Sequence, residues 1–336
     1  MKLGFSMGYA PPGTSPLQLV ALAEEAERLG FDSAWAAEAW GTDAATVLAW
    51  TGARTSRIRL GSSVMQIAAR TPAATAMTAA TLDLLSGGRL LLGLGVSGPQ
   101  VVEGWHGQPF AQPLARVREY VEIVRAALRR ETLQHEGRHY RIPYDGPGAT
   151  GLGRPLRLLA RPLRAEIPIY LAALGARSVA VAAEIADGWL PTFLDPDRLE
   201  DVFGDSLAAA PTGFEVAATT QLLVGDDVAA LRDELRPLFA LYVGGMGARE
   251  QNFYNRLVQA YGWEREAAEI QDLYLAGRRR DAAAAVPDEL IDAVALVGPP
   301  ERIRDRLPAY AEAGVTTLIC ATTQVEALRV MAELLV

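Results

Sequence analysis

The chain has 336 residues, of which 50% are hydrophobic and 21% are charged, a composition that is ordinary for a soluble enzyme. At this length, folding buries roughly 75% of the extended-chain surface, so a large core is possible. The formal net charge of −8 argues against a general binder of nucleic acids or membrane surfaces, because both partners are polyanions that attract clustered Lys and Arg.

Cysteine and histidine usage narrows the chemistry further. Cys320 is the single cysteine, which rules out an internal disulfide and makes a reducing cytoplasm the expected compartment. The three histidines have none of the spacings of a zinc site, so no metal is expected, although a site made of carboxylates alone stays open. The N-terminus lacks the apolar length of a signal sequence, and no run of about 18 apolar residues predicts a membrane span.

Short hydrophobic runs alternate with stretches of helical period, as expected of βα units around a parallel sheet. Eight candidate strands lie at residues 3–7, 33–36, 58–64, 90–94, 167–171, 188–190, 215–223 and 316–320. Eight strands with intervening helices favour an α/β fold closed into a (β/α)8 TIM barrel, with a doubly wound open sheet as the alternative.

Helix ends carry their own signals. Ser15 and Pro16 predict the start of a helix that runs to Leu29, and Gly30 predicts its end. Further helices are expected to open within residues 296–303 and to cover residues 324–335.

A single domain over residues 1–336 is predicted, with two long insertions. The first, after strand four at about residues 131–166, is rich in Gly, Pro and Arg and is expected to be irregular. The second, after strand seven at about residues 225–286, is expected to be helical from its Ala, Leu and Glu content.

In such a barrel the chemistry lies on the loops that follow the carboxyl ends of the strands. These loops supply the candidate site residues Glu38, Trp40, Asp43, Gln66, Val96, Ser97, Gly98, Glu103, His106, Leu174, Gly175, Ala176, Arg177 and Thr192.

Gly93, Gly95 and Gly98 also satisfy the G-x-G-x-x-G pattern of dinucleotide-binding folds. Pro99 follows directly, and the pattern comes after the fourth strand rather than the first, so a dinucleotide fold is disfavoured. A plain tight turn stays open. The favoured interpretation is a backbone that approaches a planar ring or a phosphate closely, where a side chain would obstruct.

The loop after strand five has the features of an anion site. Gly175 stands at a strand-to-helix junction, where free N–H groups and the helix dipole favour negative charge, and Arg177 adds a charged fork. A phosphate suits this pattern. An ordinary turn with Arg177 paired to a nearby carboxylate is the equal alternative.

Blocks spread over nearly the whole chain resemble the coenzyme F420-dependent oxidoreductases of the luciferase-like monooxygenase superfamily, with the greatest similarity to an actinobacterial group. They lie at residues 38–44, 61–72, 85–105, 183–191, 241–248 and 286–290. The resemblance implies a TIM barrel that binds the deazaflavin F420. FMN is the alternative cofactor, because the superfamily also contains flavin monooxygenases. A small organic substrate and a homodimer are likewise implied.

The resemblance also assigns expected roles to residues. The cofactor ring would lie against a bulged third strand with a non-prolyl cis peptide, which maps to Ser63-Val64. The phosphate would lie at Gly175, Ala176 and Arg177, where relatives often carry Pro-Lys. The full set implied for the cofactor is Glu38, Ser63, Val64, Gln66, Val96, Ser97, Gly98, Leu174, Gly175, Ala176, Arg177 and Thr192.

Catalytic roles are expected for Glu38, Trp40 and His106. Trp40 would desolvate the Glu38 carboxyl and raise its pKa, which suits a general acid. The alternative is a buried Glu38 carboxylate that only holds its loop, with His106 or solvent as proton donor. Asp43 is expected to cap a helix.

The sugar-phosphate dehydrogenases of the superfamily carry Asp-His where this chain has Glu38-Ala39, and the missing imidazole favours reduction over alcohol oxidation. Three hypotheses follow: an F420-dependent reductase, which is favoured, an FMN monooxygenase, and a barrel that binds cofactor without turnover.

Overall fold

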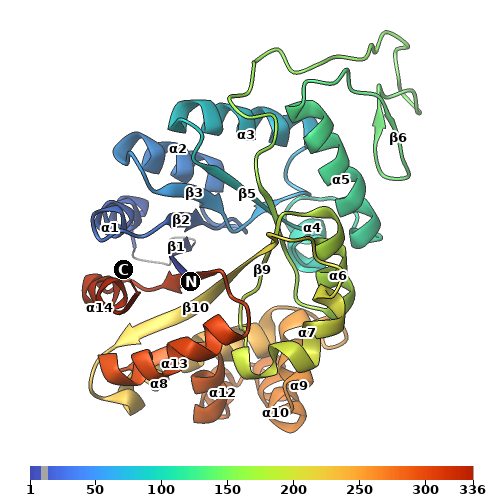
Figure 1. The fold of residues 1–336 in the computed structure, drawn as a ribbon. Coiled ribbons are helices and arrows are strands. Elements are labelled where there is room, and N and C mark those ends of the chain that lie inside the picture. Colours follow the sequence, from blue (N-terminus) through green and yellow to red (C-terminus); the bar gives the residue numbers. More distant parts are fainter. Residues whose placement is uncertain (9–13, 336) are drawn as a thin grey trace.

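The computed structural model describes residues 1–8 and 14–335 and contains a closed barrel of parallel strands (Figure 1). In order around the barrel, its strands are β12 (Thr317–Ala321), β1 (Lys2–Gly8), β2 (Ser33–Ala36), β3 (Arg59–Ser62), β5 (Leu90–Gly95), β8 (Ile169–Ala172), β9 (Gly188–Leu190) and β10 (Glu215–Val224). The barrel closes because β10 pairs with both β9 and β12. The predicted TIM barrel is therefore confirmed, and the open doubly wound sheet is excluded.

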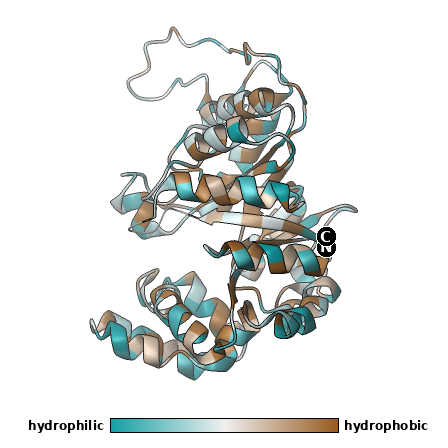
Figure 2. Cartoon of the chain, turned by 90° about the vertical axis from the view of Figure 1, so that its left-hand side faces the viewer, coloured by the Kyte–Doolittle hydropathy of each residue, from teal (hydrophilic) through white to brown (hydrophobic). Residues whose placement is uncertain are grey.

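Helices cover the outside of the barrel, and their residues alternate between hydrophobic and hydrophilic character (Figure 2). They are α1 (Pro16–Arg28), α2 (Ala44–Arg54), α3 (Pro72–Ser86), α4 (Pro99–Gly104), α5 (Pro113–Leu128), α6 (Ala176–Ile185), α7 (Leu199–Leu207), α8 (Val228–Ala240), α13 (Pro300–Glu312) and α14 (Val325–Leu335). The predicted start of α1 is confirmed, since Ser15 forms a capping box with Gln18, and Gly30 follows the helix with a φ of 88°.

The barrel interior is filled at the end where the strands begin. Trp35 and Tyr170 meet edge to face at 5.4 Å, and no side chain fits at Gly61, where a Cβ would lie 2.1 Å from the Trp35 ring. Below them, Glu215 accepts hydrogen bonds from Lys2 Nζ at 2.7 Å and from the Tyr170 hydroxyl. This end is therefore a packed plug, and the opposite end carries the loops.

The third strand is shorter than predicted. β3 ends at Ser62, and the Ser63-Val64 peptide is cis, as the resemblance implied. The chain then resumes as β4 (Met65–Gln66), which pairs with Leu94 and Gly95 of β5. Of the strand expected over residues 58–64, only Arg59–Ser62 is strand, and the second short strand, β4, begins just beyond the predicted range.

The first insertion projects from the body as an arm (Figure 1). It begins with an antiparallel hairpin of β6 (His135–Glu136) and β7 (Arg141–Ile142). The Glu119 carboxylate of α5 holds this hairpin by accepting hydrogen bonds from the backbone N–H groups of residues 138–140, each at 3.0 Å. Where the arm returns to the barrel, Arg164 donates to Asp83, which is fully buried in α3, and to the Leu90 carbonyl at 2.8 Å.

The second insertion is helical, as predicted. It contains α8, a π-helix η2 (Leu241–Gly245), and the helices α9 (Phe253–Ala260), α10 (Glu264–Leu275) and α11 (Arg279–Ala284). A 3-10 turn η1 (Pro196–Arg198) precedes α7, and α12 (Asp288–Val294) follows the insertion.

The helix expected to open within residues 296–303 is confirmed, but the strand that precedes it was not predicted. Residues 295–298 form a further parallel strand, β11 (Ala295–Gly298), which pairs with Gln221–Val224 of β10. The helix α13 begins only at Pro300. The physical reason is the length of β10, whose last residues extend beyond β9 and leave an edge that β11 covers.

Candidate active site

The predicted site residues follow the carboxyl ends of the strands, which point to one end of a parallel barrel. The loops there are joined to one another by backbone contacts. Ile67 N donates to the Gly95 carbonyl at 3.1 Å, and Thr192 forms a bridge with Thr219 of β10. The candidate site is therefore built from several separate loops on one rigid frame.

Glu38 is a buried carboxylate with three hydrogen-bond donors. Its Oε1 accepts from Arg70 Nη1 at 2.6 Å and from Gln66 N at 3.3 Å, and its Oε2 accepts from Ala44 N at 3.2 Å. These bonds tie the loop after β2 to the loop after β4 and to the start of α2. This is the set of contacts that the loop-holding interpretation of Glu38 requires.

Asp43 caps α2, as predicted, and also contacts the same arginine. Its Oδ2 accepts from Thr46 N at 2.7 Å, and its Oδ1 accepts from Arg70 Nη2. Burial raises the pKa of Asp43, but the hydrogen bonds from Thr46 and the charge of Arg70 lower it by more, so its pKa lies below the ordinary value. Asp43 is therefore a permanent anion near neutral pH, suited to hold a cation.

Gln66 is the most deeply buried polar side chain of this group, at 2% exposed. Its Nε2 donates to the Ala39 carbonyl at 2.7 Å. Within the described ranges its Oε1 is buried and has no hydrogen-bond partner. Buried polar atoms in native proteins are almost always paired with protein, water or ligand, so Gln66 Oε1 is a candidate acceptor for a bound molecule.

Two glycines of β5, Gly93 and Gly95, are required by close packing against the bulge between β3 and β4. A Cβ on Gly93 would lie 1.8 Å from the Ser62 carbonyl oxygen, and one on Gly95 would lie 2.5 Å from Val64 Cγ2. Ser97 then adopts a left-handed φ of 59°, which is uncommon for a residue with a side chain. The G-x-G-x-x-G match thus reflects strand packing and a sharp turn, and no dinucleotide fold surrounds it.

Gly175 precedes α6, and its N–H donates to Ser178 Oγ at 3.2 Å. Gly175, Ala176 and Arg177 are all exposed. In the part of the chain that the structure describes, Arg177 forms no hydrogen bond or ion pair, so the alternative of a structural Arg-carboxylate pair has no support there. The cation and the helix N-terminus are available to an anion.

The two other predicted catalytic residues lie on different loops. Trp40 is exposed on the loop after β2, between Glu38 and Asp43. His106 follows α4, where its backbone N–H donates to the Val101 carbonyl at 3.1 Å. The His106 Nε2 atom is buried and, among residues 1–8 and 14–335, finds no partner. It is a second polar atom of this region that a bound molecule could satisfy.

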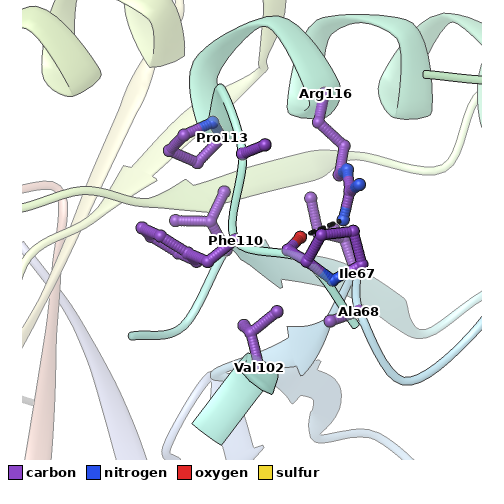
Figure 3. A pocket seen from close by; sticks show the side chains of 9 residues that line it. Ile67, Ala68, Val102, Phe110, Pro113 and Arg116 are labelled. Atoms are coloured by element: carbon purple, nitrogen blue, oxygen red, sulfur yellow. Dashed lines mark hydrogen bonds between the residues drawn. The ribbon is translucent and has the colours of Figure 1, made fainter. Parts of the chain in front are cut away.

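A small cavity lies behind the site, between β4, β5 and α5 (Figure 3). Arg116 reaches into it from α5 and donates to the Pro109 carbonyl at 3.1 Å. The other labelled lining side chains in Figure 3 are apolar, namely Ile67, Ala68, Val102, Phe110 and Pro113. The cavity is therefore mainly apolar and is enclosed by the loops after β4 and β5, by α4 and by the start of α5.

Arg70 is the site residue to which sequence reasoning gave no role. It lies 32 residues beyond Glu38, immediately before α3, and nothing in the local pattern marks it as a partner of the loop after β2. The available signal was indirect, because two carboxylates on one loop at a barrel mouth require a cation nearby.

No cluster of three or more His, Cys, Asp or Glu side chains suited to a metal occurs among the described residues. No helix within residues 1–8 and 14–335 has the length and apolar character needed to span a bilayer.

Comparison with known proteins places the chain among similar sequences and folds. Residues 3–317 match the luciferase-like monooxygenase family. A Mycobacterium tuberculosis protein to which coenzyme F420-dependent oxidoreductase activity is ascribed is 48% identical over 346 aligned positions, covering 99% of both chains.

Two solved structures share the fold at low sequence identity. The coenzyme F420-dependent tetrahydromethanopterin reductase of Methanopyrus kandleri superimposes with a TM-score of 0.81 at 22% identity, over 99% of this chain and 97% of that one. An F420-dependent secondary alcohol dehydrogenase superimposes with a TM-score of 0.79 at 16% identity, over 99% and 98% of the two chains.

Proposed function

Because the chain belongs to the luciferase-like monooxygenase family, we propose that it is a coenzyme F420-dependent oxidoreductase that transfers hydride between the deazaflavin and a small organic substrate. The observation that carries this proposal is the 48% identity, over 99% of both chains, to the mycobacterial protein ascribed the same activity. The cofactor and the reaction type expected from the sequence agree with it.

The residues at the barrel mouth fit such a cofactor. The Gln66 Oε1 acceptor is buried without a donor, and Arg177 forms no hydrogen bond or ion pair within the described ranges. A cofactor ring offers N–H donors to such an acceptor, and its phosphate tail needs a cation at a helix N-terminus. Both groups lie on loops at the same end of the barrel.

In the proposed complex the ring lies on the bulge, and the tail lies at α6. Ser63 and Val64 of the bulge and Gln66 of β4 would contact the ring from one side. Val96, Ser97 and Gly98 would contact it from the loop after β5. The phosphate would be held by Gly175, Ala176 and Arg177, flanked by Leu174 and Thr192. When bound, the deazaflavin supplies or accepts the hydride, and the protein positions the ring and excludes water.

For the proton that accompanies hydride, the geometry supports His106 over Glu38. The Glu38 carboxylate already accepts three hydrogen bonds, one of them from Arg70, and so serves to hold its loop. The His106 Nε2 atom is buried without a partner in the described chain and can exchange a proton with a bound molecule. Trp40 would cover the ring and limit access of water.

The direction of the reaction follows from the loop after β2. Ala39 offers no base, and its carbonyl is engaged by Gln66. Reduction of an unsaturated or imine-like bond needs a proton donor and a hydride, and it does not need a base at this position. We therefore propose that the enzyme reduces its substrate.

We also propose that two copies associate through the outer surface of α2 and α3, here named the α2–α3 face and defined by Trp50, Met77, Leu84 and Leu85. Surface helices ordinarily expose charges. On these two helices the charged residues are Arg54 and Asp83; Arg54 pairs with Glu24, and Asp83 is buried.

The four side chains of the α2–α3 face are exposed, with Met77 at 59% and Leu85 at 76%. Such an apolar patch on neighbouring helices suits a two-fold contact with an identical surface. A cytoplasmic location is proposed as well, supported by the presence of a single cysteine.

The main proposal can be tested by titrating the purified protein with F420 and, separately, with FMN. Fluorescence quenching reports the binding of each cofactor. F420 is expected to bind more tightly. If the protein binds FMN with micromolar affinity and does not bind F420, it is a flavin monooxygenase and the proposal is wrong.

A further inference from the structure

Arg70 lies on the loop after β4 and connects it to the loop after β2. Its Nη1 donates to Glu38 Oε1 at 2.6 Å, and its Nη2 donates to Asp43 Oδ1. The Arg70 side chain is 18% exposed and that of Glu38 only 8%, so the contact is largely shielded from water. Burial lowers the pKa of Arg70, but Glu38 and Asp43 raise it by more, which leaves the guanidinium permanently charged.

Glu38 passes this constraint to Gln66. The Oε1 atom that accepts from Arg70 also accepts from Gln66 N at 3.3 Å. The neighbouring Ala39 carbonyl accepts from Gln66 Nε2 at 2.7 Å. Both the main chain and the amide nitrogen of Gln66 are therefore held by the loop that Arg70 anchors.

The orientation of the Gln66 amide follows from these bonds. If the amide were reversed, Oε1 would face the Ala39 carbonyl oxygen, and two acceptors would meet. The oxygen is therefore directed away from Ala39. It is buried and unpaired within the described residues. The backbone of Gln66 pairs with that of Gly95 in β5.

We propose that Arg70 is a positioning residue, which acts through Glu38 to hold Gln66 so that Gln66 Oε1 accepts a hydrogen bond from an N–H group of the bound deazaflavin ring. This inference rests on the proposed function, because it requires the ring to bind at the bulge. It adds a specific acceptor for the ring and a specific device that orients that acceptor.

A double-mutant cycle on cofactor affinity tests the coupling. Gln66→Met keeps the length of the side chain and removes the acceptor, and Arg70→Met removes the anchor. Each variant is expected to bind F420 about 5- to 12-fold more weakly, the scale of one hydrogen bond. The double variant is expected to bind no more weakly than the weaker single variant, since Arg70 acts through Gln66.

Arg54→Met is the matched control. It removes an arginine of α2 whose partner, Glu24, lies on α1, away from the site, and it should leave F420 affinity unchanged. Arg70→Lys provides a conservative variant that keeps the cation but cannot span both carboxylates, and it should recover part of the affinity lost in Arg70→Met.

The possible results distinguish a failure of the proposed function from a failure of the role of Gln66 or of its coupling to Arg70. Absence of F420 binding to the unaltered protein would overturn the proposed function. Normal F420 binding by Gln66→Met would overturn the role of Gln66. Independent, multiplicative losses in the double variant would overturn the coupling, because Arg70 would then act by a different route.

Discussion

Val64 and Gly95 face each other across the bulge, so closely that a Cβ on Gly95 would lie 2.5 Å from Val64 Cγ2. Gly95→Ala should therefore force Val64 out of place, with a loss of roughly 1 to 3 kcal/mol in unfolding free energy, typical of overpacking, and weaker F420 binding. Denaturant unfolding and cofactor titration measure the two effects. Gly104→Ala, where a Cβ meets no atom within 4 Å, is the control and should change neither quantity.

Arg177 should contribute to cofactor binding and little to the fold. Arg177→Ala is expected to weaken F420 binding by roughly 1.5 to 3 kcal/mol, the scale of a charged hydrogen bond, with an unchanged melting temperature of the apo protein. Arg154→Ala, on the exposed arm, is the control. If the dissociation constant of F420 is unchanged in Arg177→Ala, the cofactor phosphate does not bind at this loop.

The proton donor can be identified by comparing two substitutions. His106→Gln should lower turnover by about 10² to 10⁴-fold with F420 affinity nearly intact if His106 carries the proton. Glu38→Gln should instead reduce cofactor affinity and stability together, because it weakens the partner of Arg70. The reverse pattern, with a large loss of turnover confined to Glu38→Gln, would return the acid role to Glu38.

The stability that the β6–β7 hairpin contributes should depend on pH. Burial raises the pKa of Glu119, but the N–H groups of His139 and Tyr140, the His135 side chain and the N–H of Arg138 lower it by more, so its folded pKa lies below 4.5. A depressed carboxyl pKa contributes stability that is fully present above the unfolded pKa and is lost as pH falls through the folded one.

Glu119→Gln should therefore be less stable than the unaltered protein at about pH 7, and the difference should shrink as pH falls below 4.5. Urea unfolding at several pH values measures this. Glu122→Gln, exposed on the same helix, is the control. A difference that is independent of pH would show that the charge of Glu119 has no part in holding the hairpin.

Association through the α2–α3 face can be tested by adding charge to it. A Met77→Asp, Leu85→Asp double substitution should shift the protein from dimer to monomer in analytical ultracentrifugation, because two-fold contact would place like charges together without solvent. Leu275→Asp, an exposed leucine of α10, should leave the dimer intact. A monomeric unaltered protein would contradict the proposal directly.

The barrel was predictable because its signals are local. Eight hydrophobic runs, the Ser15 and Asp43 caps and the helical second insertion all follow from neighbouring residues, and the structure confirms them. β11 was missed because residues 296–303 were interpreted together as the opening of a helix. The strand character of residues 295–298 comes from pairing with residues 221–224, about 74 positions earlier in the chain.

The same limit applies to the site. Strand-end positions brought Glu38, Gln66 and Arg177 to attention, since each follows a recognisable strand. The pairing of Glu38 with Arg70 depends on how two loops meet in space, and no periodicity encodes it. The cis peptide at Ser63-Val64 came from family resemblance rather than from the residues' own propensities.

The pairing that closes the barrel has a consequence for synthesis of the chain. Lys2–Ser6 of β1 pair with Thr317–Ala321 of β12, so one edge of β1 has no partner until the last strand has been made. At ordinary translation rates that interval is roughly 15 to 60 s. During it, the hydrophobic residues Leu3, Phe5 and Met7 lie beside an open hydrogen-bonding edge. An open strand edge favours pairing with other chains, so β1 is the strand most exposed to such pairing while the chain is unfinished.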